Sequence, residues 1–151
     1  MSVRAANDQD IAAIVSMGRK FWQLTPYAAL PYSMPYCPDS AADTLRQCLS
    51  HGLLFVAQSG DEVIGFIGAI AAPMPLQRDI LVAAEQFWWV EEGARGGVGR
   101  QLKLTLEQAA RDAGVTVLAM SAFEQINIEA MAKMYQRAGY DATERTYTKV
   151  L

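Results

Sequence analysis

Between residues 93 and 100 the chain has the sequence Gly93-Ala94-Arg95-Gly96-Gly97-Val98-Gly99-Arg100. The residues before it, Ile80 to Val90, are rich in aromatic and β-branched side chains and predict a strand. The residues after it, as far as Ala113, repeat apolar side chains at helical spacing and predict a helix that ends at Gly114. A loop dense in glycine therefore joins a strand to a helix.

Such a loop can bind an anion. Glycines let backbone N–H groups turn inward and approach a ligand closely. The N-terminus of the following helix adds its dipole and its unpaired N–H groups. Arg95, Arg100 and Lys103 bring positive charge to the same end of the helix. The plainer alternative is that the glycines only allow a tight turn, and the loop alone leaves both interpretations open.

Two better-known phosphate loops are excluded. A P-loop ends in Gly-Lys-Ser or Gly-Lys-Thr, whereas this loop continues as Gly99-Arg100-Gln101. A dinucleotide fingerprint needs a third glycine where Leu102 stands. It also needs an acidic residue near the end of the next strand, which here holds Ala119, Met120 and Ser121.

Composition narrows the class of protein. The chain has 151 residues, 52% of them hydrophobic, which is enough for one core, and we expect residues 1–151 to form a single domain. Thirteen Lys and Arg against 16 Asp and Glu give a net charge of −3, which argues against a general nucleic-acid binder. A local basic cluster can still hold a small phosphorylated ligand.

Neither a membrane segment nor a metal site is expected. The longest apolar run, Val63 to Leu76, is broken by glycine and proline and is too short to span a bilayer, which takes ~20 residues. The N-terminal residues 1–4 lack the apolar core of a secretory signal, so we expect a cytoplasmic protein. Cys37, Cys48 and His51 are too few for a four-ligand zinc site, and we expect two free thiols.

The remaining elements complete an alternating pattern with no linker, repeat or low-complexity segment. Strands are predicted at residues 2–6, 53–58, 62–71, 80–90, 115–121 and 143–150. Four helices are predicted. The first follows a cap at Asn7-Asp8, and the second follows a cap at Asp39-Ser40 and ends at Gly52. The third runs from Val98 or Gly99 to Ala113, and the fourth runs from Asn127 to Ala138. This order predicts a mixed sheet with helices on its faces.

Two segments resemble the GNAT superfamily of acyl-CoA-dependent N-acyltransferases. Residues 89–102 are similar to the family's glycine-rich loop, whose pattern is Gln or Arg, any two residues, Gly, any one residue, and then Gly or Ala. In the family this loop follows the fourth strand and opens the third helix. Residues 130–140 are similar to its late helix, with the ending Tyr135-Gln136-Arg137-Ala138-Gly139-Tyr140. The segment Phe87-Trp88-Trp89-Val90 is also similar to phage- and prophage-encoded members.

The resemblance covers nearly the whole chain and implies an α/β (α+β) fold. The implied sheet is mixed and mostly antiparallel, with six to seven strands flanked by four helices and with splayed fourth and fifth strands. Two alignments of the loop remain open. Either Gly97 and Gly99 match the family glycines and Ala94 stands where Gln or Arg is usual, or Arg95 matches and the loop is one residue short.

The resemblance also implies a binding site for acetyl-CoA as acyl donor. The backbone of Trp88, Trp89 and Val90 would hold the pantetheine arm, and the N–H of Trp89 or Val90 would polarise the thioester carbonyl. Asn127 is a further candidate, since the family's late helix often begins with Asn. The pyrophosphate would contact the loop residues Arg95, Gly96, Gly97, Val98, Gly99 and Arg100.

Two side chains are candidates for proton transfer. Tyr135 is the candidate general acid, because its ordinary pKa of about 10 keeps it protonated and able to donate to a thiolate. Its alternative is a core aromatic residue at helical spacing. Glu85 is the candidate general base; its alternative is a solvated or edge carboxylate. Strict strand alternation places Glu85 on one face with Phe87 and Trp89, unless a bulge intervenes.

The acceptor is expected to be a primary amine of a small molecule or protein. The aromatic residues of the segment Phe21 to Tyr36 are expected to form the acceptor wall, or else a homodimer interface or part of the core. The leading hypothesis is an acetyl-CoA-dependent N-acetyltransferase. Its rival is an inactive member of the same fold that binds CoA or mediates protein contacts.

Overall fold

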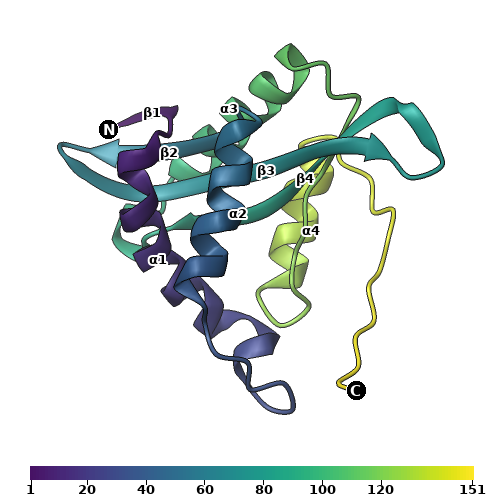
Figure 1. Cartoon of the computed structure of the whole chain (residues 1–151), viewed down its shortest axis with the longest axis horizontal. Coiled ribbons are helices and arrows are strands. Elements are labelled where there is room, and N and C mark those ends of the chain that lie inside the picture. The colour runs from purple at the N-terminus through teal and green to yellow at the C-terminus, as the bar shows by residue number, and fades with distance from the viewer.

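The computed structural model describes residues 1–151 and contains one mixed sheet of five strands, with four α-helices around it (Figure 1). The strands lie in the order β1 (Ser2–Ala5), β2 (Leu54–Ser59), β3 (Glu62–Met74), β4 (Gln77–Val90) and β5 (Val117–Ala119). The first four are antiparallel to their neighbours, and β5 runs parallel to β4. The helices are α1 (Ile11–Leu24), α2 (Pro38–Ser50), α3 (Val98–Asp112) and α4 (Ile128–Arg137).

The helices cover both faces of the sheet. One apolar cluster joins α1 and α2 to the sheet and includes Ile14, Leu45 and Phe66, all almost fully buried. A second cluster joins α3 to the opposite face and includes Ile67, Leu102 and Leu106. We call these two sides of the sheet the α1–α2 face and the α3 face. The predicted alternation of strands and helices is confirmed as a mixed sheet with a core on each face.

The two N-terminal helices differ in how well their sequences predict their starts. Asn7 caps the short 3₁₀ turn at Asp8–Asp10 that leads into α1, as expected, and the Asp10 carboxylate accepts a hydrogen bond from the Asn7 N–H. The expected cap of α2 at Asp39-Ser40 is wrong. Cys37 is the N-cap, and Pro38 occupies the first turn, where its missing N–H costs nothing.

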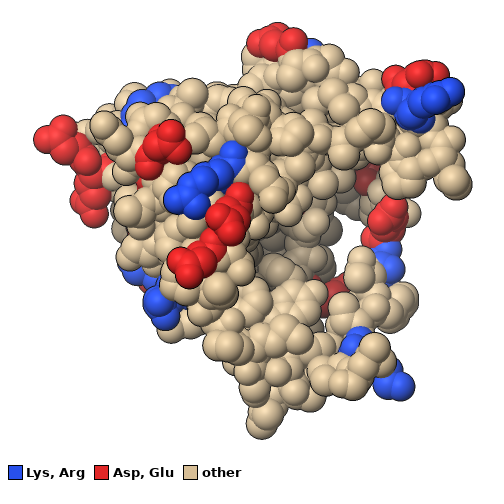
Figure 2. All heavy atoms as spheres, in the orientation of Figure 1, with Lys and Arg blue, Asp and Glu red and all other residues tan.

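The expectation of six to seven strands is wrong. Thr143–Val150 has the composition of a strand, but no backbone hydrogen bond involves residues 141–151. This segment instead meets the body through side chains, with Tyr32 Oη 2.6 Å from Thr148 Oγ1 and Arg145 3.2 Å from Glu124. Residues 141–151 extend away from the sheet and helices, and Figure 2 shows an opening between this segment and the rest of the molecule. A strand pattern needs a sheet edge beside it, and this segment has none.

The hairpin of β3 and β4 is longer than the sequence predicts. It continues to a turn at Pro75-Leu76 and pairs Pro73 with Leu81. Proline is disfavoured inside a sheet, because it cannot donate to the ladder of hydrogen bonds. The pairing of β2 with β3 ends at Gly68, so Pro73 lies in a two-stranded arm where one edge of β3 is free. Proline is tolerated at such an edge.

A β-bulge in β4 sets the faces on which its side chains lie. Gly68 pairs with Phe87 and Ala69 with Glu85, so Gln86 is an extra residue with no partner in β3. Consecutive residues of β3 point to opposite faces, and so do their partners. Glu85 therefore lies on the α3 face, whereas Phe87 and Trp89 lie on the α1–α2 face. Strict alternation would place all three on one face, and the bulge, which the sequence left open, separates Glu85 from the other two.

The splay of the fourth and fifth strands is present. β5 pairs with β4 only through Val117–Ala119 opposite Val82–Ala84. Beyond the bulge, residues 87–90 of β4 have β3 on one side and no strand on the other. The sheet therefore opens next to the glycine-rich loop.

The close approach of β3 and β4 at Gly65 gives a test of this packing. A Cβ on Gly65 would lie 2.9 Å from the Trp89 carbonyl oxygen and 3.3 Å from the Val90 Cα. We expect Gly65→Ala to force the β4 backbone outward and to lower the free energy of unfolding by about 1–3 kcal/mol, measured by urea denaturation. Gly93→Ala is the matched control, because its Cβ would have no neighbour within 4 Å. Equal stability of the two variants would contradict the register of β3 against β4.

Candidate functional site

The free edge of β4 presents two backbone N–H groups. The Glu91 N–H donates to the Ile64 carbonyl at 2.9 Å, so every second residue of β4, including Trp89, turns its backbone groups toward β3. Trp88 and Val90 alternate with these and turn their N–H and C=O groups to the side where β5 has ended. Of the two residues expected to offer a free N–H, Val90 does so and Trp89 does not.

The glycine-rich loop has the geometry that an anion site requires. Gly96 and Gly97 have φ angles of 136° and 122°, which side chains disfavour. Gly97 is the N-cap of α3 and has no side chain to cap the helix. The first helical N–H with a backbone acceptor belongs to Gln101, which bonds the Gly97 carbonyl at 3.0 Å. The N–H groups of Val98, Gly99 and Arg100 therefore remain for a ligand.

The loop and the free edge lie side by side. A Cβ on Gly99 would be 3.3 Å from the Trp88 indole, so the first turn of α3 packs directly on Trp88. Arg95 and Arg100 are exposed at this end, and the Arg95 guanidinium lies 5.4 Å from the centre of the Trp89 ring. One ligand could thus contact the β4 edge and the N-terminus of α3 together.

Lys103 does not contribute to this positive end, contrary to the sequence-based expectation. It is only 4% exposed and forms an ion pair with Glu107 one turn along α3. The Tyr140 hydroxyl donates to the same carboxylate at 2.8 Å, and the Lys103 ammonium lies 5.4 Å from the centre of the Tyr140 ring. These three residues form a buried polar cluster that ties α3 to the chain just after α4.

Hydrogen bonds set the charge of this cluster. Burial acts to raise the pKa of Glu107, but the hydrogen bonds from Lys103 and Tyr140 outweigh burial and hold the pKa below its ordinary value. Burial and the Glu107 carboxylate both raise the pKa of Tyr140. Glu107 is therefore ionised and Tyr140 is neutral near pH 7.

The side chains of Glu85 and Tyr135 are both hydrogen-bonded to the backbone of Ser121. The Ser121 N–H donates to Glu85 Oε2 at 3.2 Å, and the Tyr135 hydroxyl donates to the Ser121 carbonyl at 3.1 Å. Glu85 comes from β4, Tyr135 from α4, and Ser121 from the chain just after β5. The Tyr135 ring also lies 6.4 Å from that of Trp88. The two expected proton-transfer residues are therefore close together at the mouth of the splay.

The pKa values of these two side chains suit opposite roles. Burial raises the pKa of Glu85 to about 7, although the Ser121 N–H acts in the other direction. Burial and the neighbouring Glu85 charge raise the pKa of Tyr135 above its ordinary value. Near neutral pH, Glu85 can therefore accept a proton, whereas Tyr135 stays protonated and can donate one.

Asn127 lies apart from these groups. It is the N-cap of α4 with a left-handed φ of 51°, and its side chain makes no capping hydrogen bond. It precedes Tyr135 by more than two turns of α4 and is exposed. Its assignment to cofactor binding stays a prediction.

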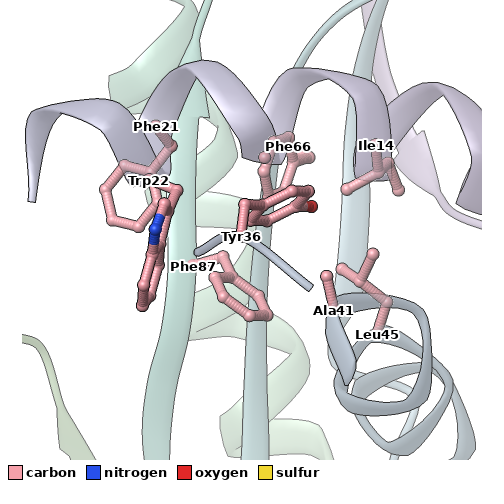
Figure 3. A pocket seen from close by; sticks show the side chains of 9 residues that line it. Ile14, Phe21, Trp22, Tyr36, Ala41, Leu45, Phe66 and Phe87 are labelled. Carbon is pink, nitrogen blue, oxygen red and sulfur yellow. The ribbon is translucent and has the colours of Figure 1, made fainter. Parts of the chain in front are cut away.

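The aromatic stretch divides between core and surface. Trp22 and Tyr36 are held by hydrogen bonds to the Met34 and Val15 carbonyls, at 3.0 and 2.8 Å. With Phe21 they line an apolar cavity of about 20 Å³ between α1 and α2, shown in Figure 3. Phe21 and Tyr27 also reach Phe123, with ring centres 6.1 and 6.0 Å away.

Three contributors to the site were missed from the sequence. Ser121 acts through its backbone, which no residue type reveals. Phe123 lies in a loop without periodicity. Glu107 could have been found, because it stands one turn after Lys103 and can pair with it.

Neither a metal centre nor a membrane-spanning helix is found in the chain. No group of three or more His, Cys, Asp or Glu side chains is arranged to hold a metal ion. No helix combines the length and the apolar character needed to cross a membrane.

Known proteins are similar to this chain in sequence. The model of the Acetyltransferase (GNAT) family matches residues 19–140. Human N-acetyltransferase 8 is 27% identical over 135 residues, which cover 88% of this chain and 59% of that protein. The chain thus spans less than two thirds of this relative. Neither match bears on the similarity to phage-encoded members, which stays a prediction.

Solved structures share the fold. A GCN5-related N-acetyltransferase from Ralstonia eutropha JMP134 has a TM-score of 0.75 and 19% identity, with 99% of this chain and 97% of that chain covered. A predicted acetyltransferase with acetyl-CoA from Clostridium acetobutylicum has a TM-score of 0.73 and 16% identity, with 99% and 95% covered.

The buried polar cluster predicts a large loss of stability when one member is removed. Glu107→Ala leaves the Lys103 charge buried without a partner, so we expect the free energy of unfolding to fall by about 3–5 kcal/mol. Glu144→Ala is the control, because Glu144 is exposed, and we expect a change within about 0.5 kcal/mol. Urea denaturation measures both. A Glu107→Ala protein as stable as the control would show that Lys103 is not buried.

The raised pKa of Glu85 predicts how stability depends on pH. Folding raises this pKa from 4.5 to about 7, so the folded state binds the proton more tightly than the unfolded state. Glu85 therefore contributes stability below pH 4.5 that is lost as the pH rises to about 7. Relative to the original protein, Glu85→Gln should gain stability across this range and level off above it. The measurement is urea denaturation at pH 5, 6, 7 and 8. A difference that does not change with pH would contradict the raised pKa.

Proposed function

Because the chain belongs to the GNAT family of acetyltransferases, we propose that it transfers the acetyl group of acetyl-CoA to a primary amine of a small molecule or a protein. The amine attacks directly in a ternary complex. The observation that carries this proposal is the meeting of Glu85 and Tyr135 at Ser121, beside the free edge of β4. We further propose that residues 1–151 act as a single acetyltransferase domain.

The residues at the splay fit acetyl-CoA. The free N–H and C=O groups of Trp88 and Val90 would pair with the amides of the pantetheine arm, as a neighbouring strand would. The uncapped N–H groups of Val98, Gly99 and Arg100, with the Arg95 side chain, would hold the pyrophosphate. Acetyl-CoA supplies the activated acetyl group and a thiolate leaving group.

Glu85 accepts the proton of the acceptor in this proposal. A primary amine is mostly protonated at neutral pH and must lose a proton before it can attack. A carboxylate with a pKa of about 7 can take that proton directly or through water. The Ser121 N–H holds the carboxylate at the mouth of the splay. Activity should therefore rise as the pH increases through about 7.

Tyr135 and the Val90 N–H act on the other side of the reaction. The neutral phenol of Tyr135 donates a proton to the leaving thiolate, and its present acceptor, the Ser121 carbonyl, keeps the hydroxyl in place. The Val90 N–H would bind the oxygen of the reacting carbonyl. A single such donor contributes about 3 kcal/mol to catalysis.

The alternative is an inactive GNAT-fold module that binds CoA or mediates protein contacts. Ala94 favours it, because the family usually has Gln or Arg there when Gly97 and Gly99 are matched. Such a module would bind CoA at the same edge and helix but would turn over no amine.

An assay of CoA release with a panel of amines tests the proposal. We expect amine-stimulated release, a kcat lowered about 10²–10⁴-fold in Tyr135→Phe, and loss of the rise near pH 7 in Glu85→Gln. Tyr147→Phe is the matched control, because this hydroxyl is on a side chain that is 85% exposed and outside the site.

Thermal shift with CoA separates the outcomes. Stabilisation by CoA without turnover of any amine supports the inactive alternative. No stabilisation by CoA would overturn both.

A further inference from the structure

An aromatic wall borders the mouth of the splay on the α1–α2 face. Phe21 is at its centre, with ring centres 6.5, 6.3 and 6.1 Å from those of Phe87, Trp89 and Phe123. Tyr27 extends the wall, 6.0 Å from Phe123. Trp89 is buried, and the other four are partly exposed. These five residues are the aromatic wall referred to below.

The wall is joined through the chain to Glu85 and to Ser121, whose carbonyl accepts the Tyr135 hydrogen bond. Phe87 stands two residues after Glu85 in β4, with the bulge between them, and Phe123 stands two residues after Ser121. The hydrogen bond from the Ser121 N–H to Glu85 draws these two segments together on the α3 face. On the opposite face, Phe21 touches both Phe87 and Phe123. A group held by the wall would therefore lie across the sheet opening from Glu85.

Two carboxylates next to the wall in the sequence are already paired, and the other neighbouring charge, the Arg95 guanidinium, is positive and lies 5.4 Å from the centre of the Trp89 ring. Glu91, near Trp89 in the chain, forms an ion pair with Lys20 at 2.8 Å. Glu124, next to Phe123, forms one with Arg145 at 3.2 Å. Neither carboxylate is free for a second ammonium group of a substrate.

The wall also holds one unused hydrogen-bond donor. Trp89 Nε1 is buried and has no acceptor, and the whole residue is 9% exposed. Buried donors almost always have a partner in folded proteins.

We propose that the acceptor is a monoamine with an aromatic or bulky apolar substituent, which packs on the aromatic wall. Polyamines and small hydroxylated amines are poor acceptors. This inference rests on the proposed function, because the wall selects the amine that Glu85 and Tyr135 act on. Aromatic faces bury apolar groups favourably, whereas this wall offers no countercharge to extra ammonium groups and only the Tyr27 hydroxyl and the Trp89 indole N–H to a hydroxyl.

Three primary amines test the proposal: 2-phenylethylamine, ethanolamine and spermidine. With saturating acetyl-CoA, we expect kcat/KM for 2-phenylethylamine to exceed that for either other amine by about tenfold or more. Phe123→Ala should lower the ratio of 2-phenylethylamine to ethanolamine about tenfold, mainly through KM. Tyr27→Ala gives a second, independent variant of the wall. Tyr147→Ala is the matched control, an aromatic residue outside the wall, and should leave the ratio unchanged.

Each contrary outcome has its own meaning. Equal or faster turnover of ethanolamine or spermidine overturns the apolar acceptor while leaving the acetyltransferase intact. Equal losses for all amines in both wall variants would show that the wall is only structural and would also overturn the inference. Stabilisation by CoA without turnover of any amine overturns the proposed function and, with it, this inference.

Discussion

The extra residue Gln86 in β4 is the constraint from which the rest of the site follows. Without it, Glu85 would lie on the α1–α2 face with Phe87 and Trp89. With it, Glu85 crosses to the α3 face and takes the Ser121 N–H as a hydrogen-bond donor. That N–H is then unavailable to the β4 backbone, and the pairing of β4 with β5 ends at Ala84 and Ala119. One bulge therefore orients the carboxylate and ends the parallel ladder.

Helix α3 links the two halves of the site. Its N-terminus packs on Trp88 and presents uncapped N–H groups beside the free edge of β4. Its middle carries Glu107, which bonds Lys103 and Tyr140. The Tyr140 N–H bonds the Tyr135 carbonyl at 3.0 Å, and the two rings lie 5.4 Å apart. A buried charge on α3 thus helps to fix the tyrosine that lies over the splay.

The sequence predicted the parts of the site that depend on local pattern. The glycine-rich loop and the helix after it came from residue type and spacing, and Glu85 and Tyr135 were candidates from residue type, position and the family resemblance. The face of the sheet on which Glu85 lies could not be predicted, because no residue type marks Gln86 as a bulge. One inserted residue moves the neighbouring side chains of the strand to the opposite face. Lys103 was misjudged because its charge suggested exposure, whereas its position on α3 is buried. Thr143–Val150 has a strand composition, but pairing depends on a neighbouring edge that composition cannot supply.

Amide hydrogen exchange with and without CoA tests the central claim, that the free edge of β4 is the binding edge. We predict that CoA slows exchange at the Trp88 and Val90 amides, because both face the splay. The Trp89 amide faces β3 and should already exchange slowly, with little change on adding CoA. Unchanged exchange at Trp88 and Val90 under saturating CoA, with protection in another part of the chain, would contradict the claim.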